Sequence, residues 1–117
     1  MNAKKNKILK QFKSQLIQIF GNDIQDVILF GSQVTGKVHE DSDYDILIVL
    51  KSDDARYYRN NILDVVYDFE LKYDIFIDFK IISMQELKNS IRGKQPFFQD
   101  AIENGIYLWH WMKKTGM

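Results

Sequence analysis

Asp43-Tyr44-Asp45 opens the apolar run Ile46-Leu47-Ile48-Val49-Leu50, and ten residues separate it from the upstream pair Gly31-Ser32. The apolar run predicts a buried strand. Because side chains alternate along a strand, Asp43 and Asp45 would share one face at its start. Two carboxylates so placed repel each other unless a cation lies between them. Mg²⁺ fits this position, since it is bound by one or two carboxylates together with substrate phosphates.

The Gly31-Ser32 pair is the second half of the pattern. It follows a shorter apolar run at residues 27–30, so we expect a turn that leaves a strand. In such a turn backbone N–H groups approach phosphate oxygens closely, and the Ser32 hydroxyl is a further donor. Either half alone is typical of an ordinary turn or a solvated acidic loop. Together they predict a site for a metal-bound triphosphate, because carboxylates beside a buried strand are costly without a counter-ion.

Hydrophobic spacing predicts the remaining elements of the fold. We expect helices over residues 3–20, 53–73, 84–90 and 96–105, a third strand over residues 75–82, a loop over residues 92–95 and a short aromatic segment over residues 106–111. In the third strand, Asp78 and Lys80 would lie on the face opposite Ile77 and Phe79. This order predicts an α/β (α+β) fold, with one layer of sheet backed by helices.

Composition restricts the class of protein. A chain of 117 residues fits a single domain over residues 1–117, and no stretch approaches the ~18 uncharged apolar residues of a membrane span. Sixteen basic and sixteen acidic residues cancel, so we expect neither a membrane nor a long nucleic acid as partner. Without cysteine or an export signal, the sequence predicts a cytoplasmic protein whose metals are held by oxygen or imidazole ligands.

The motifs resemble those of the DNA polymerase β-like nucleotidyltransferase superfamily. The matching residues are Phe30-Gly31-Ser32, Gly36 and Ser42-Asp43-Tyr44-Asp45-Ile46. Within the superfamily, the chain is most similar in length to the stand-alone minimal nucleotidyltransferases. The resemblance implies a polymerase β-like fold with a small mixed sheet. It also implies an enzyme that transfers a nucleoside monophosphate, AMP from ATP, to an acceptor hydroxyl.

The same resemblance implies which carboxylates act. Asp43 and Asp45 would hold two Mg²⁺ ions, for which Mn²⁺ can substitute. A third carboxylate would contact one of these ions and activate the acceptor hydroxyl. Asp78 matches the family pattern for this residue, which is an aspartate between apolar residues. Asp74, four residues earlier on the same expected strand face, is the alternative.

For the nucleotide, the resemblance implies binding by Gly31, Ser32 and Ser42. Many relatives carry arginines directly after the Gly-Ser pair, whereas this chain has Gln33-Val34-Thr35 there. Lys37 is then either the substitute phosphate ligand or a solvated turn lysine. This difference from the relatives predicts weaker binding of the phosphates if Lys37 does not contact them.

Minimal nucleotidyltransferases are commonly antitoxins of HEPN–MNT pairs, so the resemblance implies a partner as well. Such an enzyme transfers AMP to a tyrosine of its helical HEPN toxin. Two alternatives remain: transfer to a small molecule such as an aminoglycoside, and a non-catalytic nucleotide-binding subunit. Drug-modifying relatives usually carry an extra helical domain, for which the residues after Ser83 leave little room. The apparently complete carboxylate set disfavours the non-catalytic alternative.

Overall fold

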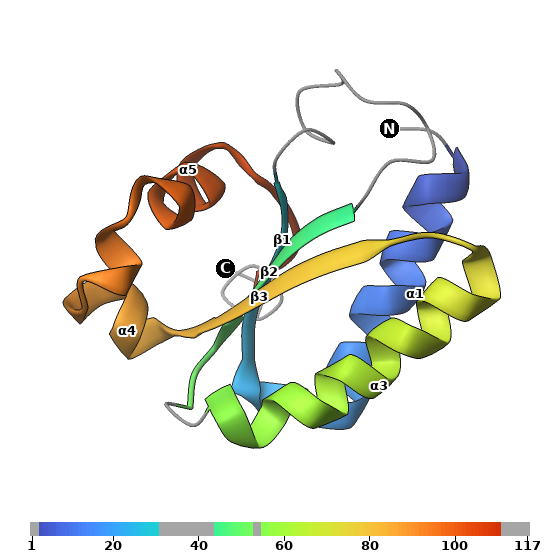
Figure 1. The fold of residues 1–117 in the computed structure, drawn as a ribbon, viewed down its shortest axis with the longest axis horizontal. Coiled ribbons are helices and arrows are strands. Elements are labelled where there is room, and N and C mark those ends of the chain that lie inside the picture. The colour runs from blue at the N-terminus through green and yellow to red at the C-terminus, as the bar shows by residue number, and fades with distance from the viewer. Residues whose placement is uncertain (1–2, 31–43, 53–54, 111–117) are drawn as a thin grey trace.

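Four strands form one mixed sheet in the order β3-β2-β1-β4 (Figure 1). The structure is a computed structural model, and it describes residues 3–30, 44–52 and 55–110. The strands are β1 (Ile24–Phe30), β2 (Tyr44–Leu50), β3 (Ile77–Ser83) and β4 (Ile106–His110). β1 is antiparallel to both β2 and β4, whereas β2 and β3 are parallel. Parallel pairing needs a crossover, and a long helix between β2 and β3 supplies it.

Helices cover both faces of the sheet (Figure 1). One face packs against α1 (Ala3–Phe20) and α3 (Ala55–Tyr73), and the other against α4 (Met84–Asn89) and α5 (Pro96–Asn104). Single 3₁₀ turns lie at Gly21–Asp23 and Arg92–Lys94. None of the helices in the described ranges is long and apolar enough to cross a membrane.

Two apolar cores, one on each face, explain why β1 is buried along its whole length and β2 at every residue except Asp45. Successive side chains of a strand point to opposite faces, so each strand feeds both cores. On the α1 and α3 face the core includes Ile46, Ile48 and Ile77. On the α4 and α5 face it includes Leu47 and Ile82. The face on which a polar side chain lies therefore follows from its position in this alternation.

The expected element order is confirmed, with three local differences. The third strand begins at Ile77 rather than residue 75, because the chain leaves α3 through Asp74, whose φ of 54° is left-handed. Residues 92–95, expected as a loop, contain the 3₁₀ turn. The aromatic segment after Gly105 is a strand that pairs with β1, where backbone hydrogen bonds hold it at the sheet edge.

Candidate active site

Asp45 and Asp78 are direct partners in the parallel pairing of β2 with β3. Neighbouring strands lie ~4.8 Å apart, so the two carboxylates leave adjacent backbones side by side. Asp45 alternates with Leu47, and Asp78 with Ile82, so both carboxylates lie on the α4 and α5 face. Asp45 is half-buried and Asp78 is exposed. The pair lies near the start of both strands, at the rim of the apolar core.

The end of β1 meets this pair. Phe30, the last residue of β1, pairs with Asp45 across the antiparallel ladder. On the opposite side, the Tyr44 backbone N–H donates to the Phe76 carbonyl at 2.8 Å, which ties the start of β2 to the segment entering β3. Phe30 directly precedes the Gly31-Ser32 pair in the sequence. The fold thus brings the strand that leads into the candidate phosphate turn beside the strand that carries Asp45.

Most of the candidate site residues fall outside the described ranges. This holds for Asp43 and for all four candidate nucleotide-binding residues, which are Gly31, Ser32, Lys37 and Ser42. Apart from the alternative Asp74, Asp45 and Asp78 are the two candidates that the described residues include. The structure brings these two together although 32 intervening residues, the whole of α3 among them, separate them along the chain.

Asp74, the alternative third carboxylate, is placed differently. It lies in the turn between α3 and β3, three residues before the strand begins, with its left-handed backbone. It has no strand partner, whereas Asp78 is in register with Asp45. The expectation that Asp74 shares a strand face with Asp78 is therefore wrong. The geometry favours Asp78 as the carboxylate that acts together with Asp45.

The donors at this pair suit a hard divalent cation. Carboxylate oxygens are the ligands that Mg²⁺ prefers, and Mg²⁺ sites typically use one or two carboxylates and fill the remaining positions with water and phosphate oxygens. Within residues 3–30, 44–52 and 55–110 no group of three metal-binding side chains occurs. Asp45 and Asp78 supply two carboxylates on one face, and Asp43 would be the third. The residues present fit the ion that the family resemblance implies.

The structure adds a feature that the sequence did not point to. Lys80 follows Asp78 on the same face of β3, and its Nζ lies 5.5 Å from the centroid of the Phe97 ring in α5. Phe97 in turn packs edge-to-face against Phe30, with ring centroids 4.7 Å apart. Alternation alone places Lys80 beside Asp78, but the contact with α5 is tertiary. On the sheet face that carries the two carboxylates, the Lys80 ammonium group therefore lies over the Phe97 ring, which packs against Phe30.

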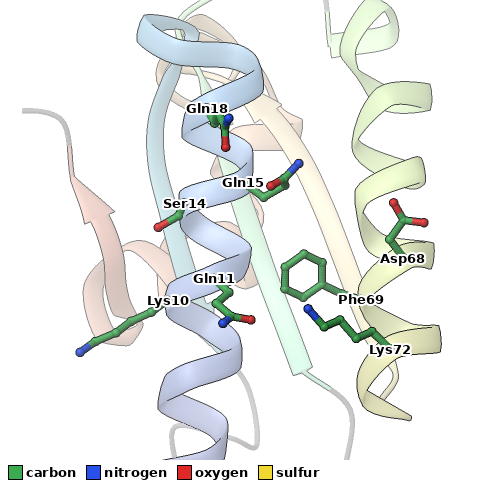
Figure 2. A pocket seen from close by; sticks show the side chains of 8 residues that line it. All are labelled: Lys10, Gln11, Ser14, Gln15, Gln18, Asp68, Phe69 and Lys72. Carbon is green, nitrogen blue, oxygen red and sulfur yellow. The ribbon is translucent and has the colours of Figure 1, made fainter.

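A polar groove of about 520 Å³ lies elsewhere, between α1 and α3 (Figure 2). Figure 2 shows Gln15 and Phe69 pointing toward the space between the two helices. These helices cover the sheet face opposite to Asp45 and Asp78. The groove is consequently separate from the carboxylate pair, in spite of its size, and plays no part in the candidate site.

A mixed sheet with two aspartates in register at its rim, and with helices on both faces, is the arrangement expected of a nucleotidyltransferase of the polymerase β-like fold. The chain belongs to the family described as the nucleotidyltransferase domain, whose model matches residues 8–103. It is 35% identical over 97 residues to a protein of Methanocaldococcus jannaschii that is provisionally named a protein adenylyltransferase. That match covers 83% of this chain and 90% of the relative.

Solved structures share the fold. A toxin–antitoxin pair crystallised with AMP-PNP matches 90% of this chain and 76% of the compared chain, with a TM-score of 0.59 and 19% identity. A complex of a tri-AMPylated Shewanella oneidensis HEPN toxin with its MNT antitoxin matches 93% of this chain and 76% of the other, with a TM-score of 0.53 and 14% identity. At these identities the likeness establishes the fold.

Proposed function

We propose that this protein transfers AMP from ATP to a hydroxyl group of a partner protein, with Mg²⁺ held by Asp43, Asp45 and Asp78. The observation that carries the proposal is the register of Asp45 with Asp78 on one face of the sheet, beside the end of β1. Family membership and the provisional name of the relative in M. jannaschii support it.

Each residue has a role in this proposal. The backbone around Gly31 and Ser32, with Ser42 and Lys37, binds the triphosphate. Asp78 accepts the proton of the acceptor hydroxyl, whose oxygen attacks the α-phosphorus. The bond between the α-phosphorus and the bridging oxygen breaks, and pyrophosphate leaves. When bound, Mg²⁺ neutralises the charge that builds up on the phosphate oxygens.

For the acceptor, we propose a tyrosine of a helical toxin of the HEPN type, which would make this chain the antitoxin of a pair. The support is the shared fold with two toxin–antitoxin structures, one with AMP-PNP and one with an AMPylated toxin.

We expect millimolar MgATP to raise the melting temperature of the protein by about 5 °C or more. A ligand that binds only the folded state stabilises it by mass action, and here the cation also relieves repulsion between the carboxylates. Scanning fluorimetry measures the shift, with ATP plus a chelator and the Asp45→Asn variant as controls. An unchanged melting temperature, together with no heat in titration calorimetry, would contradict the proposed nucleotide site.

Transfer to the partner is tested by incubating the chain with the product of its neighbouring gene, Mg²⁺ and ATP labelled at the α-phosphate. We expect the partner to gain one or more AMP units on tyrosine, as read by mass spectrometry of its peptides. Asp43→Asn should give none. Labelling of an added aminoglycoside, with the partner left unmodified, would replace the antitoxin proposal by a small-molecule activity.

A further inference from the structure

Lys80 extends the carboxylate face toward α5. It lies two residues after Asp78 on an edge strand, so its Cα is ~6.8 Å further along the same face. Its side chain is exposed, and its Nζ lies over the Phe97 ring. The ion pair found among the described residues joins Arg92 to Glu86, so no described carboxylate forms an ion pair with the Lys80 ammonium. Within the described residues, this positive charge is therefore not neutralised by a carboxylate.

Phe97 holds the position of this ammonium group. The ring is half-buried and makes edge-to-face contacts with Phe30 at 4.7 Å and with Phe98 at 4.9 Å between centroids. Such contacts fix the orientation of a ring, and a cation over the face of a fixed ring is attracted to it. The contact with α5 therefore favours one position of the Lys80 ammonium group, although the side chain is exposed.

The order of the strands shows on which side of the proposed nucleotide site Lys80 lies. β1 leads to the candidate phosphate turn, β2 carries Asp45, and β3 carries Asp78 at the edge of the sheet. If the triphosphate binds after β1 with its α-phosphorus near Asp45, as the proposed function requires, the acceptor would approach from the β3 side. Lys80 is on that side, next to the carboxylate that receives the acceptor proton in the proposed function.

We propose that Lys80 binds the oxygen of the acceptor as negative charge develops on it and selects a phenolic over an aliphatic hydroxyl, with Phe97 as the positioning residue. The inference rests on the proposed function. A phenol has a pKa of ~10 and ionises far more readily than an aliphatic alcohol, so a fixed ammonium favours its deprotonated form. Its ring also adds an aromatic partner to the Phe30 and Phe97 pair.

The step balances with the residues named. The phenolic proton goes to Asp78, the oxygen bonds to the α-phosphorus, and pyrophosphate leaves with the electron pair of the broken bond. The Lys80 side chain stabilises the negative charge that develops on the attacking oxygen. Lys80 stabilises an attacking aliphatic hydroxyl less, because its oxygen carries little negative charge before it bonds to phosphorus.

The test compares N-acetyltyrosinamide with N-acetylserinamide as acceptors, with Mg²⁺ and ATP labelled at the α-phosphate. We expect the wild type to label the tyrosine compound at least about tenfold faster. Lys80→Met should lower kcat/KM for the tyrosine compound about 10- to 100-fold. It should change the value for the serine compound less than about twofold, and move the pH of half-maximal rate upward by about one unit. Lys80→Arg should retain most activity, and Lys88→Met, at an exposed lysine of α4, should behave as wild type.

Nucleotide binding separates the possible failures. Calorimetry with α,β-methylene-ATP and Mg²⁺ should give the same Kd for Lys80→Met as for the wild type, within about twofold. A large loss of nucleotide affinity would make Lys80 a phosphate ligand and overturn the inference. Equal losses for both acceptors, or labelling of neither by a wild type that binds the nucleotide, would overturn it too. A wild type that binds no nucleotide would instead contradict the proposed function, on which the inference rests.

Discussion

Asp45→Asn is expected to lower the rate of AMP transfer by about 10³-fold or more while the protein remains folded. The substitution keeps the size of the side chain but removes the charge that would bind the cation. Loss of several kcal/mol of transition-state stabilisation corresponds to a rate effect of this size. We expect the same result for Asp43→Asn, because both carboxylates precede the same apolar run.

The measurement is the steady-state release of pyrophosphate or transfer of labelled AMP, with folding checked by circular dichroism and thermal melting. Asp68→Asn is the matched control, since Asp68 is an exposed aspartate of α3 that lines the groove on the other face of the sheet. Its rate should equal that of the wild type. A variant at Asp45 that kept more than about a tenth of the wild-type rate would contradict the proposed metal site.

Asp78→Asn is expected to reduce kcat by about 100-fold or more, whereas Asp74→Asn should change it less than about threefold. Asp78 is in register with Asp45 and is placed to receive the acceptor proton, a role worth about 10²–10⁴ in rate. Asp74 lies outside the strand, in a left-handed turn that asparagine adopts nearly as well as aspartate. The Asp74 variant should therefore keep both the turn and the site.

The two variants control for each other, since each replaces one carboxylate close to the start of β3. Single-turnover rates at saturating nucleotide separate the chemical step from binding. A larger loss at Asp74 would show that the third carboxylate has been assigned to the wrong residue. Equal losses would show that both carboxylates act together on the acceptor or the cation.

Local patterns predicted much of the fold correctly. The helical spacing over residues 3–20 matches α1 at both ends, because its apolar stripe and the following Gly21 are adjacent in sequence. Residues 46–50 lie within β2, since a run of β-branched and other apolar residues suits a strand that is buried on both faces. Pro96 begins α5, where its fixed φ suits the first turn.

The local sequence does not determine the conformation of the segment after Gly105. A short aromatic run is compatible with several conformations, and its conformation depends on which backbone groups it meets. Here the partner is β1, nearly eighty residues earlier in the chain, and the pairing makes it the strand β4. Asp74 illustrates the same limit, because alternation along residues 75–82 cannot reveal that the strand starts only at Ile77 and that Asp74 has a left-handed backbone.

The sequence by itself determined the apolar runs, the helices and the position of Asp45 near the start of β2. It also carried the resemblance to the nucleotidyltransferase family. Only the tertiary structure decided that Asp78 lies in register with Asp45 and that the Lys80 ammonium group lies over the Phe97 ring of α5. The physical reason is distance along the chain. Spacing within a segment sets which residues share a face, whereas the partner of each face depends on how separate segments pack and pair.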